Sequence, residues 1–249
     1  MRALFSVDRL TVGYGSKVVV KDVSFTIQAG EFTVLLGLNG SGKTTLLKAM
    51  CGLIKPISGR VMVHEQDILA MKERERARYL SYIPQRHSEL KGISVLDVVL
   101  MGINPQLGMF MRPNACHKAL AQDILAKADL SNLAEDDFSE ISEGQKQMVI
   151  LSRILMQNAL VLLMDEPDSS LDYLNKHKML KDTIHLIKTE AKAGIMTLHD
   201  PNLALAYADR LLMIKNGSII HDLQVKETGR MKEAFYDIYG EIKIWTFQL

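Results

Sequence analysis

The feature that most constrains the fold is a glycine-rich loop at residues 37–44, which reads Gly-Leu-Asn-Gly-Ser-Gly-Lys-Thr. An apolar run at residues 31–36 precedes it, and residues 46–53 carry apolar side chains at helical spacing. Strand, loop and helix together form the pattern G-x-x-x-x-G-K-[ST], whose backbone N–H groups curl around a phosphate. The alternative, a turn that only joins strand to helix, is disfavoured because both flanking elements are present. We call residues 37–44 the phosphate loop.

The residue types in this loop suit a nucleotide and a magnesium ion. Lys43 can reach the β and γ phosphates, the Thr44 hydroxyl can ligate Mg²⁺, and the helix N-terminus adds a positive dipole. The residues expected to contact the nucleotide here are Gly37, Asn39, Gly40, Ser41, Gly42, Lys43, Thr44 and Thr45.

Hydrophobic periodicity predicts an α/β fold. Strand-like segments at residues 4–10 and 17–27 predict an antiparallel section, and later strands that alternate with helices predict a mainly parallel, buried sheet. Helical patterns between residues 95 and 133, broken by a segment with Gly and Pro, predict an inserted helical lobe. The other predicted elements are helices at 72–79, 141–156 and 176–190, strands at 160–164 and 194–198, and a hairpin at 211–220 with an Asn-Gly turn.

Two predicted strands end in residues that can do chemistry. Asp165 and Glu166 follow the strand at 160–164, and His199 follows the strand at 194–198. A carboxylate delivered by a buried strand can ligate Mg²⁺, and the next one can orient or deprotonate a water molecule. The alternative is an exposed acidic turn that caps the strand. We call Asp165 and Glu166 the acidic pair.

Charge and hydropathy exclude several classes of protein. The 30 Lys and Arg residues balance 29 Asp and Glu residues, so there is no broad basic field to attract nucleic acid. No stretch offers the roughly 18 consecutive apolar residues that a spanning helix needs. Two cysteines cannot build a disulfide framework, and the N-terminus lacks a signal-peptide pattern, so we expect a cytosolic protein without nucleic acid as a partner.

Together these motifs resemble the ATP-binding cassette family of ATPases. The resemblance covers nearly the whole chain and rests, in the family's order, on Tyr14, residues 37–44, Gln85, residues 141–145, 161–167 and 169–172, and His199. It implies one domain over residues 1–249: an α/β P-loop core of the RecA type with a mixed sheet, an N-terminal antiparallel β subdomain and an inserted α-helical subdomain at about 88–158. It also implies a homodimer that sandwiches two ATP molecules.

The resemblance assigns roles within one chain. Lys43, Gln85, Glu166 and His199 form the implied catalytic set, in which Glu166 polarises water and His199 contacts the γ-phosphate and positions Glu166. Thr44, Gln85 and Asp165 are the implied Mg²⁺ ligands. Tyr14 corresponds to the aromatic that stacks on adenine. The alternatives are a turn tyrosine packed on the sheet for Tyr14 and a solvated loop residue for Gln85.

Other implied contacts come from the second protomer. Ser142, Gly144 and Gln145 belong to the signature segment, residues 141–145, which would bind the γ-phosphate held by the partner; alternatively, Ser142 only caps a helix. Asp172 corresponds to the aspartate that crosses the dimer interface, and it is also an acceptable helix cap.

Two positions depart from the family's pattern. The signature segment reads Ile-Ser-Glu-Gly-Gln, so Glu143 stands where glycine is common. Glu143 could face the partner's phosphate and weaken closure, or face solvent and favour the start of the helix, and we favour the second alternative. Asp168 stands where many members have Thr.

Within the family, residues 77–85 and 94–105 and the pair Tyr239-Gly240 are similar to importers of iron chelates, haem and cobalamin. We therefore expect an ATP-hydrolysing subunit at the cytoplasmic face of the cell (inner) membrane, partnered by permease subunits and indirectly by a periplasmic or surface substrate-binding protein. Residues 92–113 would border the permease groove, although the apolar residues at 107–111 could equally pack internally. A soluble cassette ATPase, a subunit for another substrate and a P-loop kinase remain alternatives.

Overall fold

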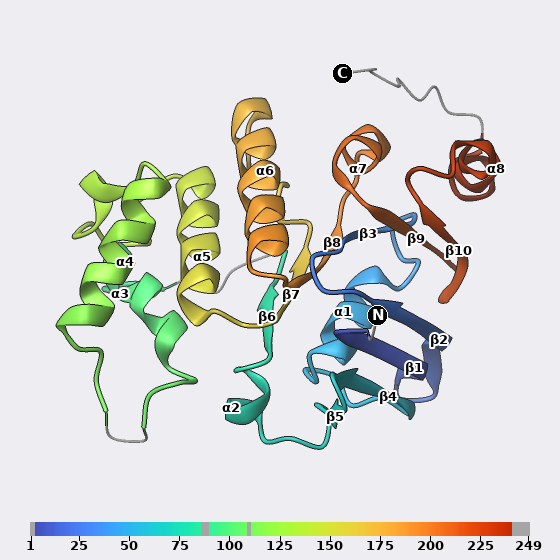
Figure 1. The fold of residues 1–249 in the computed structure, drawn as a ribbon, viewed down its shortest axis with the longest axis horizontal. Coiled ribbons are helices and arrows are strands. Elements are labelled where there is room, and N and C mark those ends of the chain that lie inside the picture. Colours follow the sequence, from blue (N-terminus) through green and yellow to red (C-terminus); the bar gives the residue numbers. More distant parts are fainter. Residues whose placement is uncertain (1–2, 86–89, 109–110, 241–249) are drawn as a thin grey trace.

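Two β-sheets organise the protein (Figure 1). The computed structural model describes residues 3–85, 90–108 and 111–240. The antiparallel sheet has the order β2-β1-β4-β5, with β1 Phe5–Tyr14, β2 Lys17–Ile27, β4 Ser58–Val63 and β5 Gln66–Asp67. The second sheet has the order β10-β9-β3-β8-β7-β6, with β3 Phe32–Leu36, β6 Leu80–Ile83, β7 Val161–Asp165, β8 Ala193–Thr197, β9 Arg210–Lys215 and β10 Ser218–Gln224. In it β9, β3, β8, β7 and β6 are parallel and β10 is antiparallel, which confirms the α/β fold with a mixed sheet.

The helices cover the second sheet and form a group of their own. They are α1 Lys43–Met50, α2 Glu73–Arg76, α3 Val95–Leu100, α4 Ala115–Lys127, α5 Glu143–Gln157, α6 Tyr173–Thr189, α7 Pro201–Tyr207 and α8 Thr228–Tyr239, with short 3₁₀ helices η1 Met101–Ile103 and η2 Ser131–Leu133. Figure 1 shows α3, α4 and α5 together at one end, with α1 beside the antiparallel sheet near the other. The boundaries of the inserted lobe stay a prediction, and residues 86–89 lie outside the described part.

The central strands are buried on both faces, which explains their apolar runs. In β3, Val34 and Leu36 pack into a core that continues through the helices of the lobe, whereas Leu35 packs into a second core with α1 and the antiparallel sheet. Strand β7 alternates in the same way, with Leu162 in the first core and Leu163 in the second. Alternation of this kind gives near-continuous hydrophobic strands in a parallel sheet.

Most predicted elements are present, and several differ in their bounds. The helix predicted at 72–79 is confined to Glu73–Arg76, and the following residues form a tight turn in which Arg78 N–H and Tyr79 N–H donate to carbonyls three residues back. The chain must turn here because β6 begins at Leu80. The hairpin between β9 and β10 is confirmed, with positive φ at Asn216 (51°) and Gly217 (82°), as a type I′ turn requires.

The helical group is fastened to the sheet by side-chain amides. Gln157, the last residue of α5, donates to the carbonyl oxygens of Ala77 (2.7 Å) and Leu80 (2.9 Å), just before and at the start of β6. Gln106 in turn donates to the Gln157 carbonyl oxygen at 2.8 Å.

Among the described helices, none combines the length and apolar character needed to span a bilayer.

Candidate nucleotide-binding and catalytic site

The order of strands in the second sheet brings the predicted site residues to one edge. Because β3, β8, β7 and β6 are parallel neighbours, the segments after them leave from the same end of the sheet. The phosphate loop follows β3, His199 follows β8, the acidic pair ends β7, and Gln85 follows β6. This is the edge at which α/β sheets bind their ligands.

The phosphate loop is shaped by glycines with backbone angles that other residues seldom adopt. Gly40 and Gly42 have φ values of 77° and 109°, and α1 begins directly afterwards at Lys43. Lys43 is 5% exposed, and its Nζ donates to the carbonyl oxygens of Gly37 (2.8 Å) and Leu38 (3.3 Å). Burial lowers the pKa of Lys43, and the charges of Glu166 and Asp165 oppose that effect. The loop lysine therefore lies within electrostatic reach of both carboxylates.

The acidic pair is buried. Asp165 is 1% exposed and Glu166 is 6% exposed, so the alternative of an exposed acidic turn is wrong. Glu166 has a φ of 49°, a left-handed conformation that is uncommon outside glycine. Burying a carboxylate costs free energy unless it is hydrogen-bonded or paired with a cation, so the partners of Asp165 and Glu166 indicate the function of the site.

Glu166 joins two of the other predicted residues. Its Oε2 lies 2.7 Å from His199 Nε2, and the same oxygen accepts a hydrogen bond from Gln85 Nε2. The His199 side chain is 51% exposed, so one side of this cluster faces solvent. A carboxylate held between a histidine and an amide, beside a buried lysine, can polarise a water molecule at an open edge.

Asp165 is held by two hydroxyl groups that the sequence analysis did not identify. Thr197 Oγ1 donates to Asp165 Oδ1 at 2.9 Å and accepts the Glu166 N–H at 2.8 Å. The Tyr82 hydroxyl lies 3.5 Å from Asp165 Oδ2, and burial raises the pKa of Tyr82. The sequence signal for Thr197 is a lone hydroxyl in the otherwise apolar run that forms β8.

Tyr239 is a second contact that the sequence analysis did not assign. Burial raises the pKa of the Tyr239 phenol, and the Gly37 backbone N–H opposes that effect. Helix α8, which carries Tyr239, is fixed to the β9–β10 hairpin because Asp237 accepts from Lys215 Nζ (2.6 Å, through its backbone carbonyl) and lies 2.8 Å from His221 Nε2. The phenol of Tyr239 in α8 thus lies within electrostatic reach of the first glycine of the phosphate loop.

Other predicted residues lie apart from this cluster. Ser142 and Gln145 form a reciprocal capping box at the start of α5, and an added Cβ at Gly144 would lie 3.7 Å from the Ser170 carbonyl oxygen. Asp172 caps α6 by accepting the Asn175 N–H at 2.8 Å. Tyr14 ends β1 and is 54% exposed, so its side chain is not buried against the sheet.

The two departures have different surroundings. The Glu143 side chain is 71% exposed, and its Oε1 lies 2.8 Å from Lys146 Nζ. Within one chain, Glu143 therefore faces solvent. Asp168 is 4% exposed, lies 3.6 Å from Lys176 Nζ, and has one oxygen, Oδ1, without a hydrogen-bond partner among the described residues.

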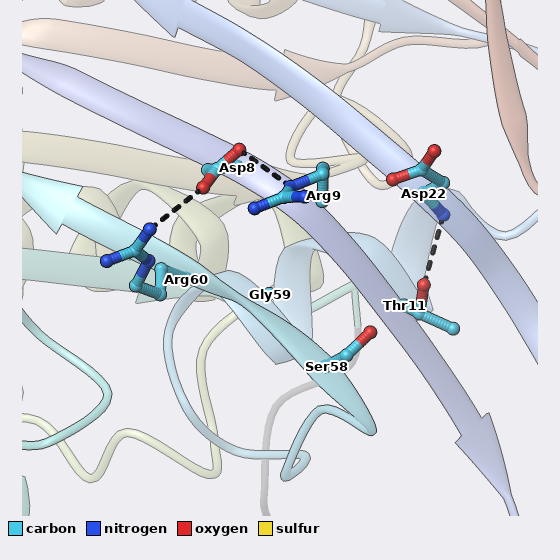
Figure 2. A pocket seen from close by; sticks show the side chains of 7 residues that line it. All are labelled: Asp8, Arg9, Thr11, Asp22, Ser58, Gly59 and Arg60. Atoms are coloured by element: carbon cyan, nitrogen blue, oxygen red, sulfur yellow. Dashed lines mark hydrogen bonds and ion pairs between the residues drawn. The ribbon is translucent and has the colours of Figure 1, made fainter.

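Two further features lie away from the cluster. In the segment at 107–111, Leu107 is buried and Met111 is 67% exposed, while residues 109–110 lie outside the described part. A cavity of about 380 Å³ lies on the antiparallel sheet. Figure 2 shows the side chains that line it, where Asp8 pairs with both Arg9 and Arg60. Its charged groups already neutralise one another, so it does not add to the site.

Comparisons with known proteins agree with this arrangement. The profile described as "ABC transporter" matches residues 20–169. A protein of Helicobacter pylori described as "Probable iron chelatin transport ATP-binding protein" is 34% identical over 237 residues, covering 94% of this chain and 93% of its own. A hemin import ATP-binding protein of Shewanella denitrificans is 37% identical over 222 residues, covering 87% and 86%.

Solved structures show the same fold. One described as a metal-chelate type ABC transporter in an inward-facing conformation has a TM-score of 0.81 at 27% identity, covering 96% of this chain and 89% of its own. An ATP-binding cassette of an ABC transporter has a TM-score of 0.84 at 26% identity, covering 96% and 99%.

Proposed function

Because the chain belongs to the ABC transporter family of ATP-binding proteins, we propose that it hydrolyses ATP to drive import of a metal chelate of the iron-siderophore, haem or cobalamin type. The observation that carries the ATPase part is the Glu166 carboxylate held between Gln85 and His199 at the edge of the phosphate loop. The chelate part rests on the relatives, which are described as iron chelatin, hemin and petrobactin import or transport proteins.

In this proposal the phosphate loop binds ATP, and the residues at the strand ends act in its hydrolysis. Lys43 and the loop amides bind the phosphates, and Glu166 polarises the attacking water while His199 holds the geometry. The residues proposed to contact the nucleotide in this chain are Tyr14, Gly37, Asn39, Gly40, Ser41, Gly42, Lys43, Thr44 and Thr45. Lys43 is buried, and its Nζ donates to the carbonyl oxygens of Gly37 and Leu38, which holds the side chain within the loop.

The donor set also fits a magnesium ion. Thr44 lies in the first turn of α1, Asp165 ends β7, and Gln85 follows β6, which places a hydroxyl, a carboxylate and an amide oxygen at the same edge. Mg²⁺ takes one or two carboxylates plus phosphate and water, so a donor set with the single carboxylate of Asp165 fits it. Bound there, Mg²⁺ would offset negative charge on the phosphates.

A second copy of the chain completes the site in this proposal. Ser142, Gly144 and Gln145 surround the start of α5, where free N–H groups favour an anion, but their described contacts are with one another and near Ser170. We infer that this N-terminus meets the γ-phosphate held by the other protomer, and that Asp172 crosses between them. Each ATP would then be bound by the phosphate loop of one protomer and the signature segment of its partner.

The membrane side of the proposal follows from the transporter relatives. Residues 92–113 would border a groove that accepts a short helix from a membrane permease, so the protein would lie peripherally at the cytoplasmic face of the cell (inner) membrane. A periplasmic or surface binding protein would act indirectly, through the permease. A nucleic-acid partner is not part of the proposal, because the net charge of +1 provides no broad basic field.

The test begins with the purified chain. We expect Mg²⁺-dependent ATP hydrolysis without an acceptor, and we expect Lys43→Ala to weaken binding of a fluorescent ATP analogue about 10- to 100-fold, the effect of losing a charged hydrogen bond. Lys48→Ala, a change in the same helix outside the loop, is the matched control. Transfer of phosphate only to a small-molecule acceptor would instead indicate a kinase.

Transport is tested by purification from membranes. Co-purification with a polytopic permease, and ATP-dependent uptake of an iron or haem chelate by vesicles that hold the complex, are the expected results. An active ATPase without a membrane partner would indicate the soluble cassette ATPase, and uptake of a different solute would contradict the chelate assignment.

A further inference from the structure

Thr197 is the one described side chain that hydrogen-bonds to both members of the acidic pair. It is the last residue of β8, is fully buried, and stands opposite Asp165 in the register of the two parallel strands. Its hydroxyl accepts the Glu166 N–H at 2.8 Å and donates to Asp165 Oδ1 at 2.9 Å. A hydroxyl has one proton to give, so an amide donor on one side directs that proton to the carboxylate on the other.

The same hydroxyl supports an unusual backbone conformation. Glu166 has a φ of 49°, and such left-handed residues persist only when their surroundings hold them there. The turn directs the Glu166 carboxylate toward Gln85 and His199. Without Thr197 Oγ1, the Glu166 N–H would lose its buried acceptor, and the conformation would lose one of the contacts that fix it.

We propose that Thr197 is a positioning residue that sets the directions of Asp165 and Glu166 together from the neighbouring strand. The catalytic consequence rests on the proposed function, in which Asp165 serves the metal and Glu166 serves the water. The other Asp165 oxygen, Oδ2, has only the longer 3.5 Å contact with the Tyr82 hydroxyl among the hydrogen bonds described for it. Thr197 therefore fixes one carboxylate oxygen and leaves the second more available to a ligand.

The chain offers a matched control in Thr33. It is fully buried in β3, the strand next to β8, and pairs with Ile195 of that strand. Its Oγ1 has no hydrogen-bond partner within the described residues. Thr33→Val and Thr197→Val therefore each remove one fully buried threonine hydroxyl from the same sheet. Only Thr197→Val also removes contacts to the acidic pair.

The test compares Thr197→Val, Thr197→Ser and Thr33→Val. In the nucleotide-free protein, Thr197→Val should speed hydrogen exchange at the Glu166 amide, whereas the other two variants should not. In the ATPase assay, Thr197→Val should lower kcat about 10- to 100-fold and raise the half-saturating Mg²⁺ concentration, as loss of partners behind metal ligands does. Nucleotide binding measured in EDTA should be unchanged, because Lys43 bonds to loop carbonyls and not to Thr197.

Three results would overturn the inference: parental kcat and Mg²⁺ dependence in Thr197→Val, an equal loss in Thr33→Val, or a serine variant no better than the valine variant. If Thr197→Val does not fold, Thr197→Ser is compared with Thr197→Cys, which has sulfur in place of the hydroxyl oxygen. Equal activity of these two variants would contradict the proposal. A parent chain that hydrolyses no ATP would refute the proposed function, while amide exchange would still decide the role of Thr197.

Discussion

At the scale of single residues, Glu143 is the departure whose consequence is easiest to measure. It lies in the first turn of α5, where a carboxylate favours the helix dipole, and its side chain is 71% exposed beside Lys146. We expect Glu143→Gly to change ATP-driven dimerisation little and to lower the free energy of unfolding by about 0.5–1 kcal/mol, because glycine disfavours helix.

Sedimentation with and without ATP, together with urea unfolding, measures both effects. Glu143→Gln is the control, since it removes the charge and keeps a good helix former. A large gain in dimerisation by both variants would mean that the carboxylate faces the partner's phosphate.

The residues of the site differ in how far a sequence can specify them. Lys43 and the acidic pair could be predicted because their motifs have fixed spacing and follow apolar strands, and strand ends of a parallel sheet meet at one edge. Thr197 and Tyr239 could not, because their contacts depend on which strands are neighbours and on where α8 docks. The roles of Tyr14, Ser142 and Asp172 stay predictions, since they concern a nucleotide and a second protomer.

At the scale of elements, the helical group depends on a close backbone approach at Gly102. This residue lies in η1, and an added Cβ would sit 2.2 Å from the Arg153 carbonyl oxygen and 2.9 Å from Met156 Cβ, both in α5. Gly102→Ala must push η1 away from α5, so we expect it to lower the free energy of unfolding by about 1–3 kcal/mol, as overpacking does.

Urea unfolding measures the change. Gly229→Ala in α8 is the matched control, because an added Cβ there has no described heavy atom within 4 Å; it should leave stability unchanged or raise it by up to about 1 kcal/mol. A Gly102→Ala variant as stable as the parent would show that the two segments can separate freely.

Element boundaries were less predictable than element types. The periodicity predicts α6 from residue 176, but the helix begins at Tyr173 because Asp172 caps it. The added residues include Tyr173 and Leu174, which are exposed and so do not continue the buried face of the helix. The charged segment at 72–79 has helical composition, yet no buried face holds its later residues in a helix before β6 begins. In both places the end of the helix is set by a local contact or by the next strand rather than by periodicity.

At the scale of the whole molecule, the two segments that we propose as the halves of a shared ATP site lie apart within one chain. Figure 1 shows α1, which follows the phosphate loop, and α5, which follows Ser142, on either side of α6. The family resemblance predicts a site divided between two copies. Periodicity alone cannot predict it, because periodicity indicates which faces are buried and not which surface a second copy covers.

The division makes Glu166→Gln the sharpest test of the assembled state. Glutamine keeps the size of the side chain but cannot take a proton from water, so we expect kcat to fall about 100- to 10,000-fold while ATP binding is kept. Because the variant keeps ATP in both shared sites, it should accumulate as a dimer, whereas the parent should form that dimer only transiently.

Steady-state ATPase assays and sedimentation with Mg²⁺ and ATP measure the two effects. Glu31→Gln is the control, because its side chain is 10% exposed and pairs with Arg210 where β3 and β9 begin, at the edge of the sheet opposite the site, so stability and not turnover should respond. Parental turnover in Glu166→Gln would remove Glu166 from the chemistry. If Glu166→Gln binds ATP without hydrolysing it but stays monomeric, the catalytic role of Glu166 would stand without the shared site. The remaining phosphate contacts would then come from a partner other than a second copy of this chain.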